Sequence, residues 1–237
     1  MNNFFLFLTD LFLPCRCVSC GTIVNSSLNY LCYECYSTLK ETTMNCPVCC
    51  GVMKDNFCSV CGNRKFYPAR NISLYSYNDT ARSIIHSLKF KGLKNIYRIF
   101  IPHICSKIQL FSNTIDIVSF IPMNRKKLIK RGYNQSKLLA LAVSKNTGII
   151  FHEVLKEKKN SVSQRNLNYD ERFINVIDRY KTVNNYMFQN KTILLIDDVF
   201  TTGATINECS RTLLSSGAAK VFTITVVRSD LKKLENI

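Results

Sequence analysis

The sequence predicts an α/β protein in which a mostly parallel sheet is flanked by helices, with a small Cys-rich region towards its N-terminus. Two runs dominated by apolar and β-branched residues, 192–196 and 116–123, are typical of strands buried on both faces of a parallel sheet. Apolar residues at helical spacing follow each run, and four C-x-x-C pairs lie within residues 17–61. We therefore expect a zinc-binding unit with an N-terminal helix at 1–66 and an α/β domain at 67–237.

The composition points to anionic partners. The chain has 237 residues, and its 32 Lys and Arg against 16 Asp and Glu give a formal charge of +16. Eight thiolates on two zinc ions would lower this charge to about +12. Such a surplus favours nucleic acid, acidic membrane surfaces or phosphorylated small molecules as partners. An AT-rich genome, which raises the Lys and Asn content everywhere, is the alternative explanation for part of the surplus.

The first fourteen residues are apolar but do not resemble an export signal or a membrane span. The segment lacks a cationic start, contains Asp10 and is too short to cross a bilayer. Leu11 to Cys15 is similar to a lipoprotein cleavage site, but Pro14 stands where a small residue is required. We expect a short helix docked on its own protein, no integral membrane segment and a cytoplasmic location.

The cysteine pairs predict two structural zinc sites. A C-x-x-C turn places two thiolates on one side of a tetrahedral ion, and a second pair about ten residues later completes the site. Interleaved pairing is the alternative, and Cys15 and Cys50 are spare cysteines beside the pairs. Disulfides would require an oxidising compartment, and iron–sulfur ligation also uses such pairs. The expected sets are Cys17, Cys20, Cys32 and Cys35 for one ion, and Cys46, Cys49, Cys58 and Cys61 for the other.

The middle of the chain alternates strand and helix patterns. Tyr75 to Tyr77 precedes a helical pattern at 79–88, which ends at Lys89-Phe90-Lys91-Gly92. The strand at 116–123 runs into a basic stretch, Asn124 to Lys137, which we expect to be a loop before a helix that ends near Gly148. A short strand at 151–155, a long polar connection at 156–176 and a strand at 220–227 follow.

The strand at 192–196 ends at the most informative stretch of the chain. Asp197 and Asp198 stand at its carboxyl end, where open α/β sheets bind ligands, and can accept hydrogen bonds from two vicinal hydroxyls. The following small residues open a helix that extends towards Gly217, and a helix N-terminus with Thr hydroxyls can hold a phosphate. A ribose 5-phosphate site is therefore expected, the alternative being an ordinary turn with two solvated acids. The phosphate-binding residues are Thr201, Thr202, Gly203, Ala204 and Thr205.

The stretch Asp-Asp-x-x-Thr-Thr-Gly-Ala-Thr, 197–205, resembles the phosphoribosyl pyrophosphate (PRPP) signature of the type I phosphoribosyltransferases. Pro122 followed by Arg131-Gly132-Tyr133-Asn134-Gln135, together with the preceding Cys pairs, resembles the ComF/GntX branch, which is associated with DNA uptake in competent bacteria. The resemblance implies a type I phosphoribosyltransferase-like fold that binds PRPP, or a related ribose phosphate, together with Mg²⁺.

The resemblance also implies roles for individual residues. Asp197 and Asp198 would be catalytic, and a flexible loop would close over PRPP. Lys158-Lys159 depart from the Arg that is often found in that loop, and a Lys is less selective there than a bidentate Arg. The residues expected to bind pyrophosphate are Asn124, Arg125 and Arg131, and those expected in the flexible loop are Lys158, Lys159, Gln164 and Arg172.

Three functions fit these observations. The first is a ComF-like protein of DNA uptake that binds PRPP, single-stranded DNA and proteins of the uptake machinery. The second is a phosphoribosyltransferase acting on an unknown base or small-molecule acceptor, which the intact pair Asp197 and Asp198 favours. The third is a non-catalytic regulator that senses PRPP. The sequence leaves the acceptor, the oligomeric state and the step of DNA uptake open.

Overall fold

The structure is a computed structural model that describes residues 15–24, 30–43, 46–51, 53–55, 57–58, 61–62, 65–111, 115–158 and 169–229. The helix predicted at 1–14 lies outside the described residues, as do Lys159 and Gln164 of the predicted flexible loop.

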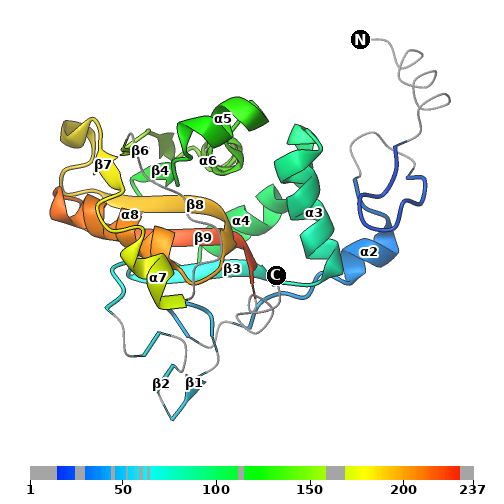
Figure 1. Ribbon diagram of the computed structural model, residues 1–237, viewed down its shortest axis with the longest axis horizontal. Helices are drawn as coiled ribbons and strands as arrows, with labels where there is room; N and C mark the ends of the chain where they lie inside the picture. The colour runs from blue at the N-terminus through cyan, green and yellow to red at the C-terminus, as the bar shows by residue number, and fades with distance from the viewer. Residues whose placement is uncertain are drawn as a thin grey trace.

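A five-stranded parallel sheet forms the centre of the molecule (Figure 1). Its strand order is β3-β9-β8-β4-β5, and every neighbouring pair runs parallel. This sheet, with helices against it and two Cys clusters in the N-terminal region, confirms the predicted α/β fold class. The strands are β3 (Arg70–Ser76), β4 (Ile117–Phe120), β5 (Ile150–Phe151), β8 (Thr192–Phe200) and β9 (Lys220–Arg228).

The side chains of β8 explain why its sequence is apolar without alternation. Leu194 and Ile196 belong to the core on one face of the sheet, and Ile193 and Leu195 belong to the core on the other. Among the described residues, four helices pack against the first core and one against the second, so both faces of the strand are buried. The first four are α3 (Asp79–Phe90), η1 (Lys94–Phe100), α4 (Ile101–Ile108) and α6 (Gln135–Thr147), and the other is α8 (Ala204–Ser215).

Two elements differ from the sequence-based expectation. Strand β8 continues past Ile196 through both aspartates to Phe200, because β9 goes on pairing with it after β4 has ended at Phe120. The basic stretch expected to be a loop forms helix α5 (Arg125–Arg131). Asn124 caps its first turn by accepting a hydrogen bond from the Lys126 N–H, and Gly132, with φ of +78°, ends it.

The N-terminal region lies along the open edge of the sheet. Backbone hydrogen bonds join Lys40 and Thr42 to β3, and the carbonyl of Pro47 accepts from the Asn71 N–H. This segment covers an edge strand that would otherwise expose its hydrogen-bonding groups. The predicted domain boundary between residues 66 and 67 stays a prediction. The region contains α2 (Tyr33–Ser37), β1 (Met53–Lys54) and β2 (Phe57–Cys58).

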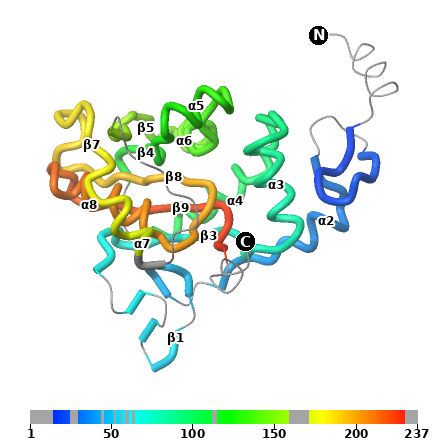
Figure 2. Tube along the Cα trace, in the orientation of Figure 1, coloured from blue at the N-terminus to red at the C-terminus, as the bar shows by residue number. Residues whose placement is uncertain are grey.

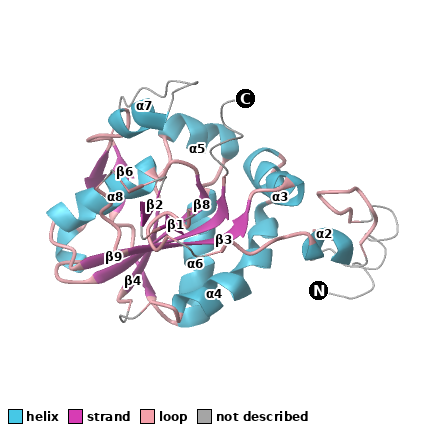
Figure 3. Ribbon diagram, turned by 90° about the horizontal axis from the view of Figure 1, so that it is seen from below, coloured by secondary structure: helices cyan, strands magenta, loops and turns pink. Residues whose placement is uncertain are grey.

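Figures 1 and 3 both place α2 beyond α3, on the side away from the sheet. A separate hairpin of β6 (Leu155–Glu157) and β7 (Tyr180–Thr182) precedes η2 (Asn185–Met187), and α7 (Tyr169–Ile174) lies within the stretch that joins the two strands. Within the described residues, no helix combines the length and apolar character needed to cross a membrane.

Candidate sugar-phosphate site and Cys clusters

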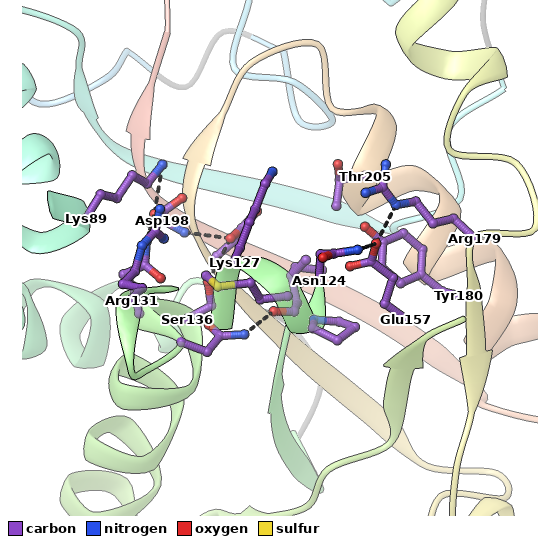
Figure 4. A pocket seen from close by; sticks show the side chains of 16 residues that line it. Lys89, Asn124, Lys127, Arg131, Ser136, Glu157, Arg179, Tyr180, Asp198 and Thr205 are labelled. Carbon is purple, nitrogen blue, oxygen red and sulfur yellow. Dashed lines mark hydrogen bonds and ion pairs between the residues drawn. The ribbon is translucent and has the colours of Figure 1, made fainter. Parts of the chain in front are cut away.

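A polar cavity of about 250 Å³ opens at the carboxyl ends of β4 and β8. Parallel neighbouring strands end at the same edge of a sheet, so residues that follow β4 meet those at the end of β8. Figure 4 shows Lys89, Arg131 and Asp198 gathered on one side of the cavity and Asn124, Glu157 and Arg179 on the other. The cavity, which we call the β4–β8 cavity, thus holds charged groups of both signs.

The two aspartates are held in different ways. Asp198 forms an ion pair of 2.9 Å with the Lys89 ammonium and accepts a hydrogen bond of 3.2 Å from Gln135 Nε2. Asp197 accepts a hydrogen bond of 2.8 Å from the Ser136 hydroxyl. Burial, and next the adjacent charge of Asp198, raise the pKa of Asp197 to about 7. One carboxylate is therefore paired with a cation, whereas the other gains and loses a proton near neutral pH.

Further cations line the cavity near these acids. Partial burial lowers the pKa of both Lys127 and Arg131, and the charge of Arg179 adds to the effect at Lys127. Arg179 Nε donates to Glu157 Oε1 at 2.8 Å, and the side chains of this pair are 12% and 6% exposed. Depressed pKa values of cations indicate a place where an anion would be stabilised.

The connection from β8 to α8 is a tight turn that leads directly into the helix N-terminus. Gly203 adopts φ of +81° and precedes α8 without a side-chain cap on the helix N-terminus. A Cβ on Gly203 would lie 2.5 Å from the ring of Phe200 and 2.9 Å from that of Phe66, so no larger residue fits there. The Thr202 hydroxyl accepts a hydrogen bond of 3.3 Å from the Ala204 N–H, while Thr205 lines the β4–β8 cavity.

The predicted site residues are distributed over several places. Those that line the β4–β8 cavity together are Asn124, Arg131, Asp197, Asp198 and Thr205. Thr201, Thr202 and Gly203 form the adjoining turn, and Ala204 is the first residue of α8. Arg125 and Lys158 line a second, larger cavity behind α5, and Arg172 lies in α7.

Several lining residues were not predicted. Lys89 lies in the last turn of α3 and begins the Lys-Phe-Lys-Gly stretch, and Gln135 and Ser136 follow Arg-Gly-Tyr-Asn, so the sequence carried a signal for these three. Glu157 and Arg179 have no such signal, because only the pairing of β6 with β7 brings them together.

Each predicted set of four cysteines forms one cluster. The four Sγ atoms within each set lie within 4.8 Å of one another, which supports the sequential pairing rather than the interleaved one. Cys20 and Cys32 are 3.6 Å apart, and Cys46 and Cys61 are 3.5 Å apart. Tetrahedral thiolates at a zinc–sulfur distance of ~2.3 Å lie about 3.8 Å apart, so each cluster fits one metal ion.

The surroundings of the clusters differ. All four cysteines of the second cluster are buried, whereas Cys20 of the first is exposed. Burial raises the pKa of Cys49 to about 12, so thiolates in this cluster require a cation. None of the twelve cysteines, all of which lie in the described part of the chain, forms a disulfide.

Curated relatives match over most of the chain. Competence protein ComFC of Bacillus subtilis is 29% identical over an alignment of 211 positions that covers 84% of this chain and 84% of that protein. Competence protein ComFC of Streptococcus pneumoniae is 26% identical over an alignment of 231 positions that covers 90% of this chain and 100% of that protein. No family model matches the sequence.

Solved structures overlap less extensively. The allosteric regulatory enzyme of purine biosynthesis has a TM-score of 0.39 and 18% identity over 55% of this chain, which spans only 26% of that enzyme's length. Adenine phosphoribosyltransferase from Thermoanaerobacter pseudethanolicus has a TM-score of 0.37 and 12% identity, over 58% of this chain and 83% of that one. The relation to known proteins rests on the sequence relatives and on the two Cys clusters, not on these structural overlaps. The chain is a homologue of the ComFC competence proteins.

Proposed function

We propose that this protein acts in DNA uptake, as a ComF-like protein that binds PRPP with Mg²⁺ in the β4–β8 cavity and also binds single-stranded DNA. The names of its relatives, competence proteins ComFC, support the process. One observation supports PRPP as the ligand: Asp197, Asp198 and Thr205 line the same cavity as Lys127 and Arg131. Vicinal hydroxyls, a monophosphate and a pyrophosphate together match that set of groups.

Each part of PRPP has a counterpart in the cavity. The N-terminus of α8 with Thr205 would hold the 5-phosphate, and Asp197 and Asp198 would accept hydrogen bonds from the ribose hydroxyls. Asn124, Lys127 and Arg131 would hold the pyrophosphate. Mg²⁺ prefers carboxylate and phosphate oxygens, and the two adjacent carboxylates fit it; when bound, it would neutralise charge on the leaving pyrophosphate.

Phosphoribosyl transfer on an unknown acceptor is the second candidate. The reaction needs no nucleophilic side chain, because pyrophosphate leaves from an oxocarbenium-like ribose that the protein only has to position and stabilise. Asp197 favours this candidate, since a carboxyl group with a pKa of about 7 can accept a proton from an acceptor at neutral pH. Pyrophosphate release in the presence of candidate bases tests it.

Two structural zinc ions complete the proposal. The Cys clusters contain four ligands each and leave no open coordination position, as in structural rather than catalytic zinc sites. Metal analysis of the purified protein should give two zinc ions per chain, and absorption in the visible range would indicate iron–sulfur clusters instead.

Titration calorimetry with PRPP and Mg²⁺ tests the binding function. We expect the wild-type protein to bind and Asp198→Asn to lose at least tenfold in affinity, because its acceptor for ribose hydroxyls is weakened. Asp116→Asn is the matched control, since Asp116 lies at the opposite end of the sheet, where it accepts from the Thr192 N–H. Equal affinities of all three proteins, or no heat with the wild type, would reject the β4–β8 cavity as a PRPP site.

A further inference from the structure

A second cavity, which we call the basic groove, lies on the side of α5 away from the β4–β8 cavity. Its volume is about 1250 Å³, larger than the roughly 300–1,000 Å³ of most small-molecule sites. Its walls come from α5, α6 and the β6–β7 hairpin. Figure 1 shows these elements on the same side of the molecule as β4, and Figure 2 shows the same for α5, α6 and β7. The cations that line it are Arg125, Lys126, Lys137, Lys156, Lys158 and Lys181.

The groove keeps a surplus of positive charge after its ion pairs are counted. Lys137 forms an ion pair with Glu153, and Glu157 forms one with Arg179 of the neighbouring cavity. Among the described residues, no carboxylate lies within ion-pair distance of the other five cations. An anionic occupant would therefore find cations that have no competing carboxylate in the part of the chain that the structure describes.

Two of these cations occupy paired positions on neighbouring strands. Lys156 of β6 and Lys181 of β7 are Cα partners in the antiparallel register, and both side chains are exposed. Partners in register project to the same face of a hairpin, and like charges at such positions destabilise it. A phosphate between the two ammonium groups would remove this repulsion. The hairpin thus has a feature that favours anion binding and disfavours the empty state.

The groove also has an aliphatic wall. Leu128 and Ile129 of α5 and Leu141 of α6 line it and are 40%, 73% and 42% exposed. Apolar side chains can pack against the faces of unpaired bases, which are accessible in a single strand but stacked inside a duplex. Large exposed apolar side chains grouped on one surface are typical of a binding site.

We propose that the basic groove binds single-stranded nucleic acid, with phosphates on the cations and bases against Leu128, Ile129 and Leu141. This inference rests on the DNA-binding part of the proposed function and gives it a location. The groove adjoins the β4–β8 cavity, and five residues line both: Pro122, Met123, Asn124, Asn134 and Glu157. Helix α5 separates them: Lys127 and Arg131 line the cavity, and Arg125, Leu128 and Ile129 line the groove.

An acidic protein segment is the competing occupant. The cations come from both helices and from the hairpin, and they continue to the cavity in which phosphate ligands are proposed. A polymer with one phosphate per unit can follow such a path, whereas an acidic helix presents its charges on one face only. These features favour nucleic acid.

The test measures binding of a fluorescent 20-nucleotide single strand by anisotropy at several salt concentrations. The groove variant is Lys156→Gln/Lys181→Gln, which removes repulsion from the hairpin and so retains the fold. The control Lys145→Gln/Lys191→Gln makes the same change in net charge at exposed positions that do not line the groove. We expect the groove variant to bind roughly tenfold more weakly, with a salt slope reduced by about 1.4, and the control to match the wild type.

The outcomes separate this inference from the proposed function. Binding by the wild type that the groove variant retains would overturn the location and leave DNA binding intact. No binding by the wild type would overturn both, and the PRPP titration would still report on the cavity alone. Polyglutamate of equal charge that binds as tightly as the single strand, and is lost in the same variant, would assign the groove to an acidic protein segment. Unchanged PRPP affinity of the groove variant verifies that it is folded.

Discussion

Asp197 is the acidic residue whose protonation ties the stability of the protein to pH. Because its pKa rises to about 7 on folding, the folded state holds a proton that the unfolded chain releases above about pH 4. The free energy of unfolding should therefore fall as the pH increases from 6 to 8, by roughly 1 kcal/mol from this residue. Asp197→Asn keeps the acceptor oxygen for Ser136 and should flatten this dependence, as measured by urea denaturation at both pH values.

Asp116→Asn again provides the comparison, because it removes a carboxylate at the opposite end of β4. It should leave the difference between pH 6 and pH 8 as large as in the wild type. A pH dependence that persists in Asp197→Asn would mean that Asp197 is ionised throughout this range, and its proposed role as proton acceptor would be lost.

The ion pair of Lys89 with Asp198 should differ in strength from an exposed pair in the same protein. The side chains of Lys89 and Asp198 are 24% and 10% exposed, against 40% and 49% for Lys137 and Glu153. We expect a coupling energy of about 1–3 kcal/mol from the cycle Lys89→Met with Asp198→Asn, since the interaction is little screened by water. The cycle Lys137→Met with Glu153→Gln should give about 0.2–1 kcal/mol. Equal couplings in the two cycles would contradict this account.

At the scale of single elements, the turn before α8 depends on the absence of a side chain at one position. Gly203 and Gly148 have φ of +81° and +75°, but a Cβ on Gly148 would meet nothing within 4 Å. Gly148→Ala should cost about 1–2 kcal/mol for its backbone conformation alone. Gly203→Ala should cost roughly 1–3 kcal/mol more, because the ring of Phe200, 1% exposed, cannot move away. Thermal denaturation of both variants tests the difference, and equal losses would show that Phe200 does adapt.

The sequence predicted elements well where a single element carries the pattern. The apolar run of β8 and the helical spacing of apolar residues in α8 are local patterns, so strand, turn and helix could be predicted. The positions of the two aspartates and of Thr205 at the junction followed from these elements. The end of β8 could not be predicted, because its last residues are held by pairing with β9 alone. Helix α5 was missed because charge dominates its sequence, while its caps, Asn124 and Gly132, decide its structure.

Side chains that meet only through tertiary structure could not be inferred. Glu157 and Arg179 are separated by a long connection and face each other because β6 pairs with β7. The pairing of Lys156 with Lys181 arises from the same register, so the arrangement of cations in the groove could not be predicted from the sequence either. The Cys clusters are the opposite case, since the chemistry of four thiolates at short spacing fixes their partners.

At the scale of the whole molecule, the two Cys clusters are attached to different faces of the sheet. Cys17 packs with the core that contains Leu194 and Ile196, and all four cysteines of the second cluster pack with the core that contains Ile193 and Leu195. The segment that links the clusters runs along β3. The N-terminal region thus extends from one face of the sheet past its edge to the other, and a metal ion in each cluster would stabilise a different core.

Loss of the two zinc ions should therefore have unequal consequences. Cys58→Ser removes a ligand that is 5% exposed inside the second core, and we expect it to lower the free energy of unfolding by about 3 kcal/mol or more, because metal binding and folding of that core are linked. Cys20→Ser changes an exposed ligand of the first cluster and should leave the main unfolding transition within about 1 kcal/mol of the wild type. Urea denaturation followed by circular dichroism measures both changes.

A chelator added to the wild-type protein should show the same order. The ion bound by Cys20 and its partners should leave first, because that site is open to solvent, and release of the second ion should coincide with loss of the main transition. A colorimetric zinc indicator recorded together with circular dichroism resolves the two steps. Simultaneous release of both ions with complete unfolding would mean that the clusters stabilise a single cooperative unit, because the segment along β3 couples the two cores too tightly for one to lose its metal alone.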